Sequence, residues 1–397
     1  MRRRSNLTIA AALAVASLIP TAANAVAAPV SRGDQGSFSY AVYGDAPYGT
    51  SPTDTSETDA TPAFIDQVNA DPSVSAVIHV GDIHSGSQYC TEAYDRRIAG
   101  LWTRFADPLV YTPGDNEWSD CHKKKEGGGV YNSTTGQIDY ILGADGQPVD
   151  YAKGNPVANL ALVRSIFFPT AGATLGSGTL QTISQAQAYD PAHPSDAQYI
   201  ENVMWQRKGV VFVTVNIPGG SNNDADPWYG TPTASNEQTT EAATRTAADL
   251  RWLDAAFGIA QEQDAQGVVV ITQADMWDLD GAPSATHLSN YEPIVSSLAT
   301  HTTAFGKPVI LFNGDSHTYR SDNPLQQGAP CTGDKGVCAT DDWTGHPFYD
   351  VPNFHRVVVH GSTVPLEYLR LTVTPGDHAA STSTSFGPFS WERVQEG

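Results

Sequence analysis

Four aspartates follow strand-like runs of apolar residues, and their position predicts a site for a cation. They are Asp45, Asp82, Asp115 and Asp315, and each comes directly after a glycine. The runs that precede them, at 38–43, 76–80, 109–112 and 309–312, are rich in β-branched, aromatic and aliphatic residues. Carboxylates buried together repel one another, and divalent cations are the usual compensation in proteins. The pattern therefore predicts metal-dependent chemistry.

The elements that position these residues alternate along the chain. A fifth apolar run at 268–272 ends in Gln273-Ala274-Asp275, and helical patterns lie between the runs. These helical patterns cover 61–69, 94–105, 239–263 and 292–302. Strands that alternate with helices predict an α/β layered fold with a parallel or mixed sheet. Because ligands in such folds bind outside the carboxyl ends of the strands, we expect the five polar strand ends to converge on one site.

The remaining segments are less regular. Residues 126–200 are rich in Gly, Pro, Ser and Thr, with one helical pattern at 157–167, and predict a long insertion that forms a rim or lid. Further strands are expected at 210–217, 356–359, 368–373 and around Trp391. We expect the last three of these to form a second sheet packed on the first.

The order of the motifs resembles that of the calcineurin-like metallophosphoesterases. That family carries D-x-H, G-D, G-N-H-D/E, a lone His and G-H-x-H at successive strand ends. The corresponding segments here are Asp45-Ala46-Pro47, Gly81-Asp82, Gly114-Asp115-Asn116-Glu117, Gln273 and Gly314-Asp315-Ser316-His317. The resemblance extends over roughly residues 38–375. It implies an αββα two-sheet sandwich flanked by helices, forming one domain over 36–397 with its insertion at about 126–200.

The resemblance also implies a centre with two divalent metal ions. Asp82 would be the bridging carboxylate, and Asp45 and His317 would complete the first site. The second site would take Asn116 and Asp315, with Gln273 at the lone-His position, or Asp275 if the register differs. Two such ions about 3.5–4 Å apart activate water and bind the phosphoryl oxygens of the substrate.

Four positions depart from the family pattern, because a histidine of the family is replaced at Pro47, Glu117, Gln273 and Asp315. The histidine replaced by Glu117 helps to stabilise the transition state and the leaving group in the family. His84 and His122 are alternative proton donors, and for each the other interpretation is a solvated loop histidine. Among Mn, Mg, Ca, Fe and Zn, the oxygen-rich ligand set favours Mn²⁺, Mg²⁺ or Ca²⁺.

The N-terminus and the cysteines both indicate an oxidising compartment. Arg2–Arg4, the apolar stretch 7–19 and Ala23-Asn24-Ala25 are typical of a signal peptide over 1–25, which predicts a secreted or periplasmic protein. Four cysteines allow three disulfide pairings. Sequence spacing favours Cys331 with Cys338, and therefore Cys90 with Cys121. Metal binding by these cysteines is the competing interpretation, but no C-x-x-C pair occurs.

The net charge and the apolar stretches limit the partners. A formal charge of −21 disfavours nucleic acid and anionic membranes, so we expect no specific nucleic-acid binding. Beyond the N-terminal segment no apolar stretch is long enough for a membrane span. The oligomeric state remains open.

The expected function is hydrolysis of a phosphomonoester or phosphodiester, in a small molecule or a polymer, outside the cytoplasm. The alternative is a non-catalytic extracellular metal-binding protein on a degenerate version of the same fold. A Ser/His hydrolase would need a G-x-S-x-G turn after a strand, and the sequence contains none.

Overall fold

The computed structural model describes residues 36–223, 226–278, 285–338, 346–362 and 366–395. The signal peptide predicted over 1–25 lies outside these residues. None of the described helices combines the length and the apolar character needed to cross a bilayer. The formation of Cys90–Cys121 and Cys331–Cys338 confirms the predicted disulfides, which are typical of an oxidising compartment.

The first sheet contains the early strands of the chain. Within the described residues it has seven strands in the order β17-β18-β16-β1-β2-β3-β6. Their bounds are β1 (Phe38–Tyr43), β2 (Val74–His79), β3 (Pro108–Tyr111), β6 (Leu175–Gly176), β16 (Glu367–Val373), β17 (Ser385–Phe386) and β18 (Phe389–Gln395). β1, β2 and β3 are parallel, β16 runs antiparallel beside β1, and β18 runs antiparallel beside β16. The carboxyl ends of β1, β2 and β3 therefore meet at one edge.

The second sheet is larger, with nine described strands in the order β14-β13-β12-β15-β11-β10-β9-β8-β7. Their bounds are β7 (Ile183–Ser184), β8 (Val203–Arg207), β9 (Val210–Thr214), β10 (Gly267–Ile271), β11 (Val309–Asn313), β12 (Arg320–Asp322), β13 (Thr332–Gly333), β14 (Gly336–Val337) and β15 (Phe354–Val358). The central strands β9, β10, β11 and β15 are parallel, and the outer strands are antiparallel. Parallel strands need both faces covered, which explains why the central runs are almost wholly apolar.

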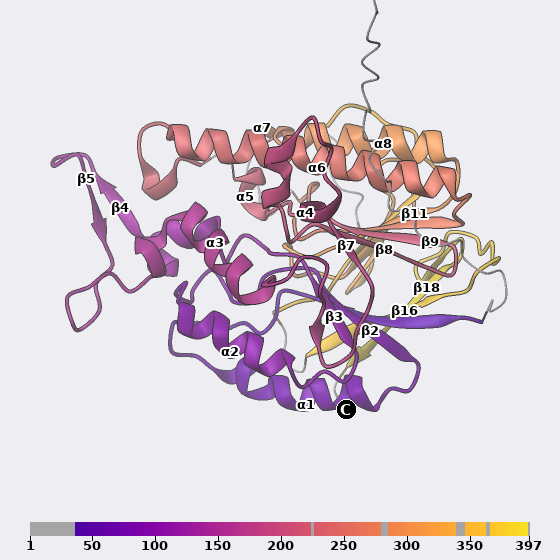
Figure 1. Ribbon diagram of the computed structural model, residues 1–397, viewed down its shortest axis with the longest axis horizontal. Coiled ribbons are helices and arrows are strands. Elements are labelled where there is room, and N and C mark those ends of the chain that lie inside the picture. Colours follow the sequence, from indigo (N-terminus) through magenta and orange to yellow (C-terminus); the bar gives the residue numbers. More distant parts are fainter. Residues whose placement is uncertain (1–35, 224–225, 279–284, 339–345, 363–365, 396–397) are drawn as a thin grey trace, which may run out of the picture.

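Helices cover the outer face of each sheet, so the predicted αββα layering is confirmed (Figure 1). On the second sheet lie α6 (Asn236–Glu262) and α8 (Glu292–Phe305), with α4 (Gln185–Ala188), α5 (Gly219–Asn222) and α7 (Ala285–Ser289) as short helices nearby. On the first sheet lie α1 (Ser56–Ala70), α2 (Glu92–Trp102) and α3 (Pro156–Phe167). The short 3₁₀ helices are η1 (Asp120–His122), η2 (Lys124–Glu126), η3 (Tyr151–Gly154), η4 (Pro194–Gln198) and η5 (Trp228–Gly230).

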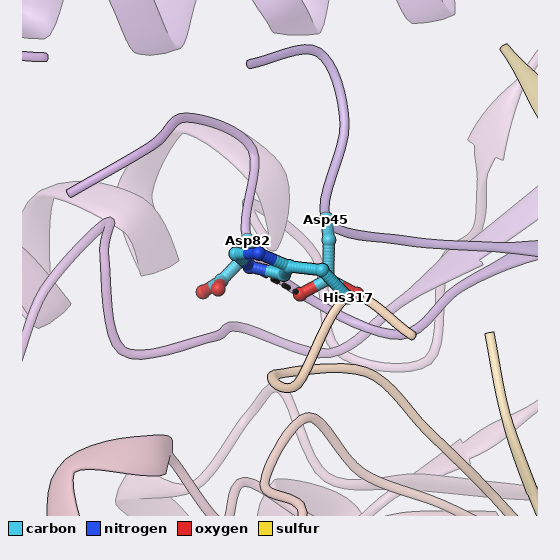
Figure 2. A group of neighbouring side chains, drawn as sticks. All are labelled: Asp45, Asp82 and His317. Atoms are coloured by element: carbon cyan, nitrogen blue, oxygen red, sulfur yellow. Dashed lines mark ion pairs between the residues drawn. The ribbon is translucent and has the colours of Figure 1, made fainter. Parts of the chain in front are cut away.

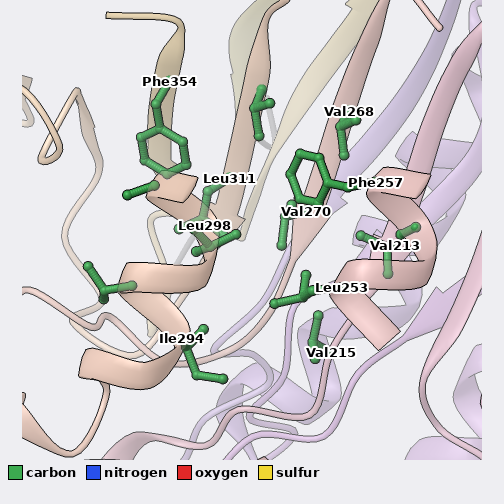
Figure 3. Close-up of a cluster of buried hydrophobic side chains, with 14 of the residues drawn as sticks. Val213, Val215, Leu253, Phe257, Val268, Val270, Ile294, Leu298, Leu311 and Phe354 are labelled. Atoms are coloured by element: carbon green, nitrogen blue, oxygen red, sulfur yellow. The ribbon is translucent and has the colours of Figure 1, made fainter. Parts of the chain in front are cut away.

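Three apolar layers hold these elements together. Between the sheets, side chains such as Val42 and Ile78 pack against Phe212 and Ile271. Figure 3 shows the layer between the second sheet and its helices, where Phe257 of α6 joins the side chains of β10 and β11. Each fully buried Val, Leu, Ile or Phe contributes about 1.5–3 kcal/mol relative to exposure. The cores fix both sheets, and hence the relative positions of the loops at their carboxyl ends.

The structure corrects three expectations about elements. β15 lies in the sheet of β10 and β11, while β16 and β18 lie in the sheet of β1, so the predicted late strands do not form one sheet. Residues 126–200 do not form one insertion apart from the core, because β6 and β7 extend the two sheets and α3 packs on the first. Within that segment the hairpin of β4 (Gly129–Asn132) and β5 (Gln137–Tyr140) projects from the body (Figure 1). The first helix begins at Ser56, well before the expected residue 61, and includes Pro62.

Candidate metal centre

Asp45, Asp82 and His317 come together from three loops. Asp45 follows β1, Asp82 follows β2 and His317 follows β11. Each offers one ligand atom, and these atoms lie within 4.8 Å of one another. Figure 2 shows the three side chains and the ion pair between His317 Nε2 and Asp45 Oδ1, which are 3.6 Å apart. The two aspartates are buried and His317 is partly exposed, so the group has one side toward solvent.

The loops that carry these residues have an unusual backbone. Asp45, Asp82, Asp315 and His317 all adopt positive φ, between 48° and 76°. A residue with a Cβ adopts this backbone conformation at a cost of about 1–2 kcal/mol. Residues in such conformations cluster at functional sites. Hydrogen bonds stabilise it, because Asp45 N donates to Gly81 O at 2.9 Å and Asp315 N donates to Asp45 Oδ1 at 2.8 Å.

Glycines allow the loops to approach the carboxylates. A Cβ on Gly114 would lie 2.0 Å from Asp82 Oδ1, and one on Gly314 would lie 2.3 Å from Asp45 Oδ2. Neither oxygen could stay in place beside a larger residue. The glycine before the acidic residue in each of these motifs therefore has a steric role.

Asp82 is oriented by four hydrogen bonds. Tyr48 Oη, Asn116 Nδ2 and Gln273 Nε2 donate to Asp82 Oδ2 at 2.7, 3.0 and 3.2 Å, and Asn116 N donates to Asp82 Oδ1 at 3.2 Å. Burial, together with the charge of Asp82, raises the pKa of Tyr48 well above its ordinary value, so this hydroxyl stays protonated and donates. The ring of Tyr48 also packs edge-on against His317, with centroids 5.0 Å apart.

Asp115 is a buried residue of the centre to which the sequence analysis gave no ligand role. Asp115 Oδ2 and Asp315 Oδ1 lie 2.5 and 2.6 Å from the place where a Cβ on Gly219 would stand. The two carboxylates therefore approach each other across Gly219. Asp115 belongs to the four strand-end aspartates, but the family motif implies a ligand at the neighbouring Asn116 instead. Its position after a strand and a glycine was the available signal.

The buried carboxylates of Asp45, Asp82 and Asp115 have the charge needed to bind divalent cations. Burial, followed by the neighbouring carboxylates, raises the pKa of Asp45 and Asp82 well above the usual range, and burial and Asp120 raise that of Asp115 to about 7. Without a cation, simultaneous ionisation of these groups is therefore costly. Asp45 Oδ2 is buried and has no hydrogen-bond partner among the described residues, which leaves it free for a metal. Apart from His317 the donors are oxygens, as suits Mn²⁺, Mg²⁺ or Ca²⁺.

The end of β10 places the side chain of Gln273 against Asp82 and Asp115. Gln273 Nε2 donates to Asp115 Oδ1 at 3.0 Å as well as to Asp82, and its Oε1 accepts from Gly219 N. As placed, Gln273 links two carboxylates through its amide nitrogen, and a ligand role for its oxygen stays a prediction. Asp275 forms an ion pair with Arg356 instead, at 2.6 Å.

Glu117 lies beneath the loops that follow β2 and β3 and anchors their backbone. Its Oε1 accepts from Gly114 N at 2.6 Å, Asp82 N at 3.2 Å and Tyr111 Oη at 2.5 Å, and Ile83 N lies 3.4 Å from its Oε2. A carboxylate suits position 117 because both of its oxygens can accept hydrogen bonds from the N–H groups of the loop backbone. A direct catalytic role for Glu117 stays a prediction.

The two candidate proton donors are both buried. His84 Nδ1 lies 3.2 Å from Ser85 O, and its Nε2 has no partner among the described residues. His122 Nδ1 accepts from Tyr229 N at 3.0 Å. Burial lowers the pKa of each to about 4, so both are neutral at pH 7. Neither has a described contact with Asp45, Asp82 or His317, and their catalytic roles stay predictions.

The Cys90–Cys121 disulfide supports the centre from the side of Asn116. The two sulfurs lie 3.3 and 3.6 Å from Asn116 O. The bridge thus packs directly against the loop whose backbone and side chain both bind Asp82. A covalent link at this point restricts the movement of that loop.

Comparisons with known proteins give a distant likeness in structure alone. No family model matches the sequence, and no curated protein matches it either. Among solved structures, the chain resembles a purple acid phosphatase from yellow lupin (Lupinus luteus) seeds, with 13% identity and a TM-score of 0.39, over 93% of this chain and 53% of that one. It also resembles PhoD, with 11% identity and a TM-score of 0.41, over 85% of this chain and 64% of PhoD. The chain spans less than two thirds of either protein.

Proposed function

We propose that this chain is a metal-dependent phosphoester hydrolase that acts outside the cytoplasm. The observation that supports it most directly is the meeting of Asp45, Asp82 and His317, with ligand atoms within 4.8 Å and Asp45 Oδ2 buried without a partner. The order of the strand-end motifs adds to this support. The two disulfides agree with an extracellular or periplasmic location.

The ligands divide into two groups around Asp82. Asp45, Asp82 and His317 would hold one divalent cation. Asp115 and Asp315, with Asn116, would hold a second, because these carboxylates face each other across Gly219. When bound, the ions supply Lewis-acid polarisation of a phosphoryl oxygen and a nucleophilic water at neutral pH.

The residues of the chain fix the geometry and the direction of approach. The donors on Asp82 hold its carboxylate in one orientation, so little reorganisation is needed when substrate binds. Asp45 and Asp82 are buried, whereas Ser316 and His317 are half-buried and Gly220 is exposed. A phosphoester would therefore approach over the 314–317 loop, and His317 is the ligand nearest to solvent.

The test compares the oxidised protein with Asp82→Ala and with Asp66→Ala, whose carboxylate is exposed on α1. Bound Mn²⁺, Mg²⁺, Ca²⁺, Fe and Zn²⁺ are counted by plasma mass spectrometry, and hydrolysis of 4-nitrophenyl phosphate and bis(4-nitrophenyl) phosphate is followed with each metal. We expect about two equivalents of metal and hydrolysis of at least one ester, both lost in Asp82→Ala and kept in Asp66→Ala.

Other results would contradict either the catalytic activity or the metal centre. Metal binding without hydrolysis of either ester, or of a wider phosphoester panel, would favour the alternative of a non-catalytic metal-binding protein. No bound metal, or equal behaviour of Asp82→Ala and the unsubstituted protein, would refute the metal centre itself. Asp82→Ala should fold in the absence of metal, because it removes one of several buried carboxylates that repel one another.

A further inference from the structure

A buried arginine of β15 is connected to the candidate metal centre through Asp275. Arg356 is fully buried and lies between two carboxylates. Its Nη1 donates to Asp275 Oδ1 at 2.6 Å, while Nε and Nη2 donate to the two oxygens of Asp322 at 2.9 and 2.7 Å. The guanidinium also lies over the ring of Trp277, 5.3 Å from its centroid. Such a fully enclosed, multiply bonded arginine has little freedom to move.

The two carboxylates that bind Arg356 lead to different parts of the molecule. Asp322 lies in β12 and stands opposite Arg356 in the β-ladder, so its backbone is fixed by strand pairing. Asp275 contacts the loop of the candidate ligands instead. Its Oδ2 accepts from Ser316 Oγ at 2.9 Å, and its backbone N donates to Asp315 Oδ2 at 2.9 Å.

The ion pair between Arg356 and Asp275 lowers the electrostatic repulsion around the 314–317 loop. Asp275 is buried close to Asp315 and Asp45, and an uncompensated charge there would repel both. Arg356 compensates that charge, so the Asp275 carboxylate can accept the Ser316 hydroxyl without adding to the repulsion. Breaking a buried ion pair by removing one partner is strongly destabilising, so this contact is a firm constraint.

We propose that Arg356 and Asp275 are positioning residues of the metal centre. The ion pair holds Asp275, and Asp275 in turn orients Ser316 and Asp315, the segment that ends in His317. This inference rests on the proposed metal centre and adds to it a control of metal affinity by residues that do not touch the metal. The sequence pattern indicates Asp275 only as an alternative ligand.

The decisive experiment is a matched pair of variants, Asp275→Asn and Asp322→Asn. Each variant replaces one of the two carboxylates that bind Arg356 by an amide. Within the described structure, only Asp275 of the two contacts the 314–317 loop. Mn²⁺ is the probe, with free Mn²⁺ measured by electron paramagnetic resonance and thermal unfolding recorded without metal. We expect both variants to lower the Tm. Asp275→Asn should also weaken Mn²⁺ binding by about 10–100-fold, whereas Asp322→Asn should change it about twofold or less.

Ser316→Ala is the second variant, because it removes the hydroxyl that binds the Asp275 carboxylate and leaves the hydrogen bond from Asp275 N to Asp315 in place. Ser316 is partly exposed, so this variant should keep the Tm of the unsubstituted protein and still bind Mn²⁺ more weakly. It therefore reports on positioning even if Asp275→Asn does not fold.

The outcomes separate this proposal from the proposed function. Equal Mn²⁺ affinity in the two aspartate variants, or unchanged affinity in Ser316→Ala, would overturn the positioning role while leaving the metal centre intact. Failure of the unsubstituted protein to bind Mn²⁺ or any other divalent ion would overturn the metal centre, and this proposal with it.

Discussion

Replacing Gly219 or Gly220 by alanine should separate metal binding from stability. A Cβ on Gly219 would lie 2.5 Å from Asp115 Oδ2 and 2.6 Å from Asp315 Oδ1, and φ of Gly219 is not in the left-handed region. Gly220 is the reverse case. Its φ is +60°, and the nearest atom to its Cβ would be Asp120 Oδ1 at 3.3 Å.

The expected magnitudes follow from these contacts. To restore ordinary contact distances in Gly219→Ala, the two carboxylate oxygens must retreat by about 1 Å. Disturbing groups around a metal typically costs about 10–100-fold in affinity, and we expect at least that here. The backbone of Gly219 can accept alanine, so metal-free stability should change by less than about 1 kcal/mol. Gly220→Ala instead forces a Cβ into the left-handed region, which costs about 1–2 kcal/mol.

Two measurements on each variant test this reasoning. Mn²⁺ affinity comes from isothermal titration calorimetry, and the free energy of unfolding comes from urea denaturation without metal. We expect Gly219→Ala to lose affinity and keep stability, and Gly220→Ala to lose stability and keep most of its affinity. Unchanged Mn²⁺ binding in Gly219→Ala would refute the placement of Asp115 and Asp315 in the metal centre. Equal loss of Mn²⁺ affinity in both variants would mean that any change in this loop weakens metal binding, whichever glycine is replaced.

Three further predictions concern stability. Glu117→Gln should lower the free energy of unfolding in urea by about 3 kcal/mol, because an amide nitrogen would face buried N–H donors, and a change near zero would contradict the anchoring role. Replacing Cys90 and Cys121 together by serine should cost about 3–4 kcal/mol, since the bridge spans 31 residues, and a loss no larger than for the other bridge, which spans 7, would contradict this. Burial opposes ionisation of Glu367, but hydrogen bonds from His360, Arg393 and the Gln395 amide outweigh it and lower its pKa from 4.5 to about 2. Its contribution is therefore complete above pH 4.5 and is lost as the pH falls toward 2, so Glu367→Gln should flatten the pH dependence of unfolding in this window, and parallel curves would refute the assignment.

Local patterns in the sequence were sufficient for the long helices and the central strands of both sheets. The run at 38–43 is a strand with the expected bounds, and the helical pattern at 239–263 corresponds to Asn236–Glu262. These elements follow from periodicity and burial, which are properties of neighbouring residues. The assignment of β16 and β18 to the sheet of β1 could not be predicted in this way, because strand pairing depends on residues more than 300 positions apart in the chain.

The sequence by itself predicted that the aspartates following parallel strands would converge, because the carboxyl ends of such strands meet at one edge of a sheet. The tertiary structure decided their contacts. Gln273 donates to Asp82 and Asp115. Asp275 forms an ion pair with Arg356, and Glu117 accepts hydrogen bonds from the loop backbone. These choices depend on distances of a few ångströms between loops from different strands. Such distances are set by the packing of two sheets and their helices, which motif spacing does not encode.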